Sequence, residues 1–138
     1  MVSFEIAKKL KEKKYDEYCD NGYFLKDGLE YLLPFNDHVF TTIKGQRIFD
    51  IGFCTFEGEF NNETDIVKAP KITDILSWLR KKYKIYVVIH PLYIDDKEVF
   101  EVTIHNRKRF NKPLVVGYYD SWDVAEEKGT EYVINNVI

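Results

Sequence analysis

The clearest pattern of apolar and polar positions lies between residues 70 and 83. Apolar side chains recur there at intervals of three and four, which predicts an amphipathic helix. The stripe consists of Ile72, Ile75, Leu76, Leu79 and Tyr83, with Trp78 at its border. Pro70 stands at the helix entrance, where its missing backbone donor costs nothing. The pattern changes at Lys84, so we expect a strand to follow directly.

Three strands are expected after this helix, in the segments 85–94, 98–106 and 114–120. The first, IYVVIHPLYI, is rich in the β-branched and aromatic residues that favour strands. The second, EVFEVTIHN, alternates, with Phe100, Val102 and Ile104 on one face and Glu101, Thr103 and His105 on the other. A turn at residues 95–97 separates these two strands, and the polar tip NRKRFNKP precedes the third, LVVGYYD.

A last helix is expected to begin after a cap at Asp120 or Ser121. One face of it carries Trp122, Ala125, Gly129, Tyr132, Val133 and Asn136. Ala125 and Gly129 are small and one turn apart, so this helix can lie close to its neighbour. A glycine inside a helix costs about 1 kcal/mol relative to alanine, which makes close packing the better explanation for Gly129.

The first half of the chain carries weaker signals. Ser3 is expected to cap a helix over residues 4–14. Asn21-Gly22 and Asp27-Gly28 are turn pairs, and the second lies between YFL and LEYLL as in a β-hairpin that ends at Pro34. A second hairpin is expected where HVFTTI and RIFDIGFCTFEGEF flank residues 44–46, followed by a polar loop at 61–65.

These elements predict an α+β fold, with an N-terminal helix and β-hairpins followed by an α-β-β-β-α unit whose helices pack on an antiparallel sheet. The first strand directs Ile85, Val87 and Ile89 toward the helices, but it places Tyr86, Val88 and Leu92 on the opposite face. A sheet that is apolar on both faces needs a cover on both. We therefore expect a single domain, 1–138, in which residues 1–66 cover the core unit 67–138. The alternative is a homodimer joined through the same face.

Composition agrees with a compact globular chain. The 138 residues are 45% apolar and 31% charged, which excludes wholesale disorder. A net charge of −3 gives no overall attraction to nucleic acid or to an anionic membrane. The N-terminal residues lack the apolar core of a signal peptide, and no apolar run reaches membrane-spanning length. Cys19 and Cys54 form no CxxC pair, so we expect a cytoplasmic protein without a disulfide framework or a zinc site.

Reactive motifs are not evident in the sequence. It contains no GxSxG, Walker-type or GxGxxG loop, and no HExxH or HxH spacing. By strand parity His90 and His105 share a face with Glu101, a set of ligands that can hold a metal ion. Satisfied surface histidines are the more common explanation of such a set. We therefore expect no catalytic, cofactor-binding or metal site, and no enzymatic activity.

The basic residues are more informative, because eight of the eleven that follow residue 70 fall in two clusters. The clusters are Arg80, Lys81, Lys82 and Lys84, and then Arg107, Lys108, Arg109 and Lys112. In an antiparallel sheet both are expected at one end of the domain, with Tyr83 and Phe110 among them as a stacking surface for bases. Nucleic acid or another anion could bind there. The alternative is that these cations only complement the negative C-terminal ends of the two helices.

The α-β-β-β-α order is also that of double-stranded RNA-binding domains, so charge has to be compared as well. Those domains contact RNA through the first helix, the loop after the first strand and a basic start of the second helix. Here the corresponding loop and helix start are acidic, with Asp95, Asp96, Asp120, Asp123, Glu126 and Glu127. Acidic side chains would repel the RNA backbone, so we reject that function.

Three segments resemble a family of short, uncharacterised proteins encoded in prophages and mobile elements of Bacteroides-type gut bacteria. They are IAKKLKEKKYDEYC, APKITDILSWLRKKYKIYVVI and YYDSWDVAEEKGTEYVINNVI. The resembling motifs lie near both ends of the chain and are packing patterns. Lys71 departs from the Thr or Ser common after Ala-Pro, which weakens the helix cap. The resemblance implies a phage- or element-borne origin and brings no catalytic residues.

The leading hypothesis from the sequence is a small, non-enzymatic accessory or binding protein that acts by contact with an unknown protein partner, as a monomer or a homodimer. The first alternative is a nucleic-acid-binding module that uses the two basic clusters. The second alternative is a cryptic metal-dependent enzyme.

Overall fold

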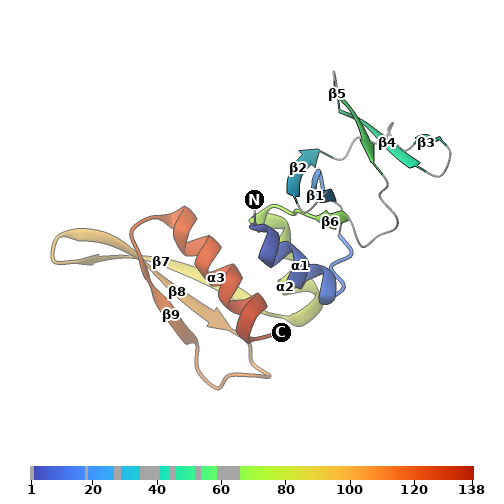
Figure 1. The fold of residues 1–138 in the computed structure, drawn as a ribbon. Coiled ribbons are helices and arrows are strands. Elements are labelled where there is room, and N and C mark those ends of the chain that lie inside the picture. Colours follow the sequence, from blue (N-terminus) through green and yellow to red (C-terminus); the bar gives the residue numbers. More distant parts are fainter. Residues whose placement is uncertain are drawn as a thin grey trace. The chain divides into compact units, whose positions relative to one another are not determined.

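The computed structural model describes residues 2–17, 19–26, 29–34, 41–43, 46–51, 54–58 and 66–138, with side chains for 2–17, 19–23 and 67–138. The chain divides into two compact units, Met1–Pro70 and Lys71–Ile138, which we call the first and second units (Figure 1). The described residues of the two units form three helices and three antiparallel sheets, which confirms the predicted α+β fold. The single domain remains a prediction.

The first unit begins with α1 (Phe4–Glu12), whose cap is the one predicted. The Ser3 hydroxyl accepts a hydrogen bond from the amide of Ile6, and the helix buries Ile6, Ala7 and Leu10. A sheet with the strand order β2-β1-β6 follows, built from β1 (Asn21–Lys26), β2 (Leu29–Pro34) and β6 (Ile66–Lys68). The Tyr23 hydroxyl donates a 2.8 Å hydrogen bond to the carbonyl of Val2, which ties the start of the chain to this sheet.

A further sheet of the first unit consists of β3 (Thr41–Ile43), β4 (Gln46–Ile51) and β5 (Cys54–Gly58). Both predicted hairpins are present as paired strands, but two expectations were wrong. Asn21-Gly22 is no turn: it opens β1 and pairs with Pro34 and Leu33, because strand pairing overrides its local turn preference. The run RIFDIGFCTFEGEF is not one strand but contributes to β4 and β5, which pair with each other. The predicted loop at 61–65 lies outside the described residues.

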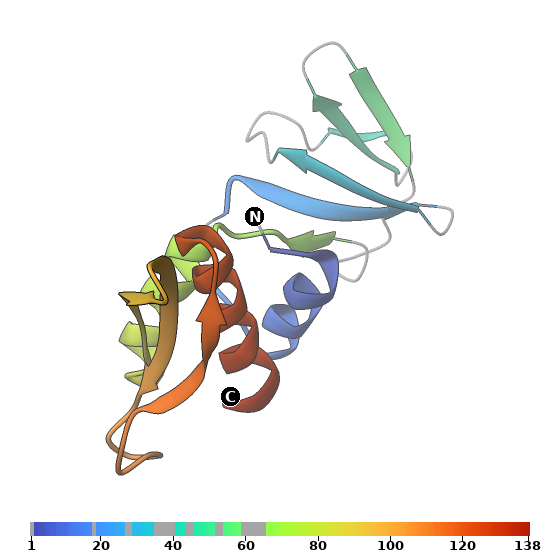
Figure 2. The same cartoon turned by 90° about the vertical axis from the view of Figure 1, so that its left-hand side faces the viewer.

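The second unit has the predicted order of helix, three strands and helix. It consists of α2 (Ile72–Tyr83), β7 (Tyr86–Ile94), β8 (Lys97–His105), β9 (Leu114–Tyr119) and α3 (Trp122–Asn136). The strands form one antiparallel sheet in the order β7-β8-β9 (Figure 2). Lys84 ends α2 in a left-handed conformation with φ 57°, and Asp95 and Asp96, with φ 51° and 62°, form the tight turn between β7 and β8.

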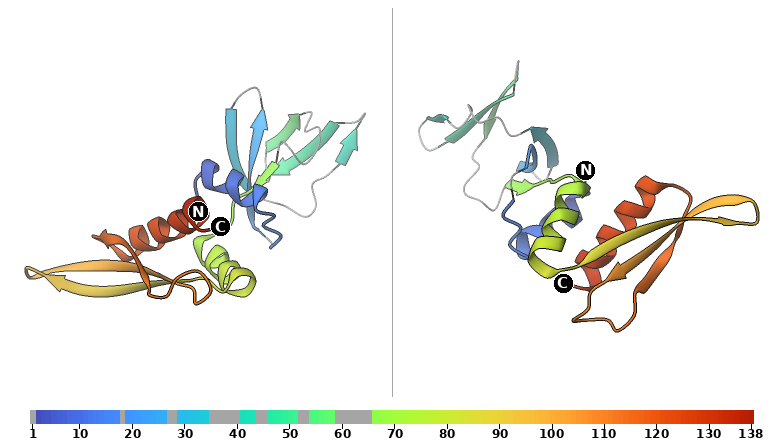
Figure 3. Two further views of the ribbon diagram at one scale, coloured as in Figure 1. Left: turned by 90° about the horizontal axis from the view of Figure 1, so that it is seen from below. Right: turned by 180° about the vertical axis from the view of Figure 1, so that it is seen from behind.

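The helix α3 lies against one face of this sheet (Figure 3), and α2 packs on both α3 and β7, so the core of the second unit lies between this face and the two helices. Val102 and Ile104 of β8 are completely buried, as the alternation predicted. A Cβ atom on Gly129 would lie 2.6 Å from Cγ1 of Val87 and 2.8 Å from Cγ1 of Val102. Those distances are shorter than van der Waals contact, so Gly129 allows the close approach that its position in the sequence suggested.

The predicted face of α3 needs one correction. The helix buries Ala125, Gly129, Thr130, Val133 and Ile134. Trp122 is 46% exposed and Asn136 is also exposed, so the helix turns these two end positions away from the core. The indole of Trp122 instead donates a 2.8 Å hydrogen bond to the Glu126 carboxylate.

Among the described residues, no helix has both the length and the apolar character needed to cross a bilayer. The longest described helix is α3, with 15 residues, five of which are charged.

Candidate functional site: the basic end of the second unit

Both helices of the second unit stop at the same end of the sheet. Tyr86 pairs with His105, so β7 begins where β8 ends, and α2 stops only two residues before β7. An Arg109 Nη1 atom donates a hydrogen bond to the carbonyl of Val137, which follows α3. The C-termini of α2 and α3 and the β8–β9 connection therefore meet, and we call this region the basic end.

Asn106 holds the basic end together. Its side chain is 6% exposed, and its Nδ2 atom donates to the carbonyls of Tyr83 and Lys84 at 3.0 and 3.3 Å. Its Oδ1 atom accepts from the amides of Lys108 and Arg109, both at 3.0 Å. These bonds satisfy carbonyls at the end of α2, which have no partner inside the helix. They also fix the turn after β8, so one side chain sets the distance between the two basic segments.

A pocket of about 530 Å³ opens at this point. It is lined by Lys84, Tyr86, His105, Asn106, Arg107 and Lys108. Lys84 comes from the first basic cluster, whereas Arg107 and Lys108 come from the second, so the pocket brings the two clusters together. Its volume lies within the range of about 300–1,000 Å³ that is common for ligand pockets.

The other five predicted cations do not line the pocket. Arg80, Lys81 and Lys82 occupy the last turn of α2, and Lys112 lies in the connection before β9. The ammonium of Lys82 lies 5.2 Å from the ring centroid of Trp78 and 5.6 Å from that of Tyr83. Tyr83 and Phe110, which the sequence suggested as stacking groups, are not pocket residues either. The aromatic side chain that lines the pocket is Tyr86.

The positive charges of this region are not paired with acidic side chains of the second unit. All eight cations are exposed, and none forms an ion pair with a described residue. The C-terminus of a helix carries roughly half a negative charge, so α2 and α3 together offset about one of eight positive charges. Compensation of the two helix C-termini therefore accounts for only a small part of the positive charge in this region.

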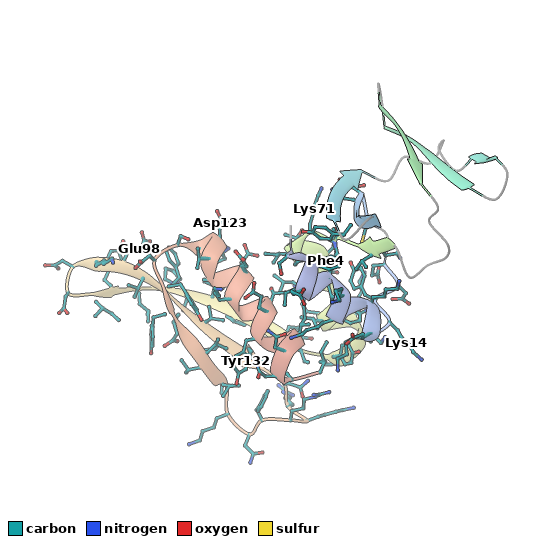
Figure 4. All side chains as sticks on the ribbon, in the orientation of Figure 1. Phe4, Lys14, Lys71, Glu98, Asp123 and Tyr132 are labelled. Carbon is teal, nitrogen blue, oxygen red and sulfur yellow. The ribbon has the colours of Figure 1, made fainter. Side chains whose placement is uncertain are left out.

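Acidic residues gather at the other end of the sheet. Asp95 and Asp96 form the turn between β7 and β8, and Asp120 forms a 3.0 Å ion pair with Lys97. Figure 4 labels Glu98 near that turn and Asp123 at the start of α3. The nine residues of β8 span about 30 Å, which is nearly four times the screening length of about 8 Å at physiological salt. The acidic end therefore does not neutralise the basic end.

The face of the sheet opposite α3 is not covered by any element of the second unit, all of which the structure describes. Cross-strand pairing arranges its side chains in rows: Tyr86 with His105, Val88 with Thr103 and Val115, and His90 with Glu101 and Tyr118. Tyr86, Val115 and Tyr118 are 45%, 50% and 54% exposed. We call this surface the open face. Its cover by residues 1–66 remains a prediction.

Tyr118 is held by its neighbour on the open face. A hydrogen bond with the Glu101 carboxylate, and then the negative charge of that carboxylate, raise the pKa of Tyr118 above its usual 10.0. Both causes favour the neutral phenol. Tyr118 therefore belongs to an acidic neighbourhood, unlike Tyr86, which lies among cations.

The histidines do not form a metal centre with Glu101. Register places His90 directly opposite Glu101 and His105 on the same face, as strand parity predicted. The His105 Nε2 atom, however, lies 3.0 Å from the Thr103 hydroxyl. Across the residues that the structure describes, no three His, Cys, Asp or Glu side chains are placed to hold a metal ion.

Two residues of the pocket, Asn106 and Tyr86, were not predicted as site residues from the sequence. Asn106 carried one signal, because an asparagine at the start of a turn often bonds backbone amides two residues on. Tyr86 carried the signal of parity alone, which placed it on a face that we expected to be covered.

Comparison of the chain with protein-family models, with curated proteins and with solved structures finds no match.

Proposed function

We propose that this protein is a non-enzymatic binding protein and that its basic end contacts the phosphate backbone of a nucleic acid. The observation that carries the proposal is the pocket in which Lys84, Arg107 and Lys108 meet. Cations that neutralise phosphates release condensed counterions, and this release drives most sequence-independent binding to nucleic acids. We expect dissociation constants of about 10⁻⁴–10⁻⁶ M at physiological salt, and tighter binding at low salt.

The test is fluorescence anisotropy with labelled oligonucleotides over a series of salt concentrations. The site variant carries Lys84→Glu, Arg107→Glu and Lys108→Glu. The control variant reverses the three cations of the second unit that lie outside both clusters. These are Lys71, Lys97 and Lys128.

Both variants change the net charge equally, so they separate a local site from overall charge. We expect the site variant to lose binding and the control variant to keep it within about threefold. Equal losses in both variants would show that net charge alone decides binding, and would contradict the proposal. So would the lack of any binding by the wild type at low salt.

Contact with another protein, the leading hypothesis from the sequence, is the second candidate. The open face favours it, because Tyr86, Val115 and Tyr118 leave apolar surface accessible. A partner that covers this face, a second copy of the chain included, would contact Tyr118, which is 54% exposed. A specific partner, or self-association in sedimentation equilibrium, should therefore be lost with Tyr118→Asp. Retention of the partner by that variant would remove this candidate.

We also propose a cytoplasmic location and a phage- or mobile-element origin. The location is supported by the two cysteines, which form no CxxC pair. The origin is supported by the three segments that resemble proteins of such elements. Integrase, mobilisation or structural phage genes should flank the gene, whereas a conserved housekeeping operon around it would contradict this origin.

A further inference from the structure

We infer that the ligand of the basic end is single-stranded nucleic acid, with one base stacked on Tyr86 and the neighbouring phosphates bound by Lys84, Arg107 and Lys108. This inference rests on the proposed function and names the form of nucleic acid that the site accepts. It follows from the position of Tyr86, from the rigidity of its surroundings and from the direction of the two helices.

Tyr86 belongs to two surfaces at once. It lines the pocket together with the cations, and it is also the first residue of the open face. Its side chain is 45% exposed, so part of the ring is accessible to a ligand. An aromatic ring beside a cationic groove is the arrangement that binds single strands without sequence preference, because every base has a face that can stack.

The backbone that carries the cations around Tyr86 is held in place before any ligand arrives. Lys84 is fixed at the end of α2, where its carbonyl accepts a hydrogen bond from Asn106 at 3.3 Å. Lys108 is fixed through its amide, which donates to the same side chain at 3.0 Å. The backbone positions of both cations are therefore set relative to β7. Such preorganisation lowers the entropic cost of binding.

The geometry disfavours a duplex for two reasons. Bases in a duplex are already stacked, and extracting one costs a few kcal/mol. Phosphate contacts by helices use the free amides of N-termini, whereas α2 and α3 present their C-termini here. The phosphates must therefore be bound by flexible side chains. A single strand can adapt its backbone to the positions of these side chains more closely than a rigid duplex can.

The site is confined to one end of the open face. Tyr118 is the other exposed aromatic residue in these rows, but it lies beside Glu101, two rows away from Tyr86. Two rows correspond to about 13 Å along the strand. The carboxylate of Glu101 repels phosphate, so the strand should leave the sheet before it reaches Tyr118. We expect one stacked base and about three phosphate contacts.

Tyr118 also supplies a matched control, because it has the same side chain on the same face with similar exposure. The experiment uses the full chain, a fluorescein-labelled oligothymidylate of roughly fifteen nucleotides, and a duplex of equal length. The variants are Tyr86→Leu, Tyr86→Phe and Tyr118→Leu. Circular dichroism of each variant establishes that it is folded.

We expect the single strand to bind the wild type more tightly than the duplex does. Tyr86→Leu should weaken binding of the single strand by about tenfold, within the range for loss of one stacked base. Tyr86→Phe should bind as the wild type does, and Tyr118→Leu should differ by less than twofold. Because three phosphates are contacted, log K should fall with log salt at a slope of about −2. Tyr86→Leu should leave this slope unchanged.

The outcomes separate this inference from the proposed function. If the duplex binds as tightly as the single strand and Tyr86→Leu has no effect, the inference is overturned, although charge reversal can still abolish binding. If neither oligonucleotide binds, both the inference and the proposed function fail. If Tyr86→Leu and Tyr118→Leu weaken binding equally, the whole open face is used. The claim that the site is confined to one end of the open face would then be wrong.

Discussion

Removal of the Asn106 side chain should loosen the basic end of the second unit. In Asn106→Ala the carbonyls of Tyr83 and Lys84 and the amide of Lys108 lose their partner. The amide of Arg109 keeps its 3.2 Å bond to the backbone carbonyl of residue 106. Each of the three lost bonds contributes about 1 kcal/mol net to stability. We therefore expect the free energy of unfolding to fall by about 2–3 kcal/mol.

Tryptophan fluorescence during urea denaturation reports this loss. The chain has two tryptophans, Trp78 and Trp122, and both lie in the second unit, so the signal follows that unit alone. With an m value of about 1 kcal/mol per molar urea, the midpoint should fall by about 2–3 M. The m value itself should not change, because the same surface is exposed on unfolding.

Asn111→Ala is the matched control for this prediction. Asn111 lies in the same connection between β8 and β9, is exposed, and forms no side-chain hydrogen bond with a described residue. We expect its midpoint to remain within about 0.5 M of the wild type. Equal stability of Asn106→Ala and Asn111→Ala would refute the claim that Asn106 organises the basic end.

Two further predictions concern the core and the open face. Gly129→Ala places a methyl group against Val87 and Val102. The overpacking costs about 3 kcal/mol and the higher helix propensity of alanine offsets about 1 kcal/mol, so the second unit should be destabilised by about 2 kcal/mol. In a background that carries both Val87→Ala and Val102→Ala, and so lacks both contacts, the same change should be neutral or stabilising by urea denaturation; stabilisation of the wild type would contradict the packing of α3. Glu101→Gln removes the negative charge that raises the pKa of Tyr118, so the phenol should ionise at lower pH than in the wild type, as followed by NMR. An unchanged titration curve would show that this carboxylate does not act on Tyr118.

The elements of the second unit were predictable because their boundaries carry local signals. Ser121 caps α3 through its hydroxyl, and the Asp95-Asp96 pair adopts the left-handed turn that a short hairpin requires. The first unit was harder to predict, because its strands depend on distant partners. Gly22 pairs with both Leu33 and Lys68, so two neighbouring strands, one of them 46 residues away, override its preference for a turn.

The site was predictable in its charge and not in its detail. Antiparallel topology placed the two basic clusters at one end, an inference that needs only strand order and direction. The contacts of Asn106 join it to carbonyls 22 and 23 residues earlier in the chain, which no local pattern encodes. Tyr86 was assigned to a covered face because its apolar neighbours suggested burial. Its exposure could be recognised only from the arrangement of the second unit.

The most direct test of the account is an amide NMR titration of the full chain with the single-stranded oligothymidylate. The central claim is that the two basic segments and Tyr86 act as one site for a single strand. We predict saturable shift changes that are largest at residues 84, 86 and 105–108 and that share one dissociation constant. Changes centred on Tyr118 and Glu101, or in the first unit, would contradict the claim, and so would an unchanged spectrum with oligonucleotide in excess.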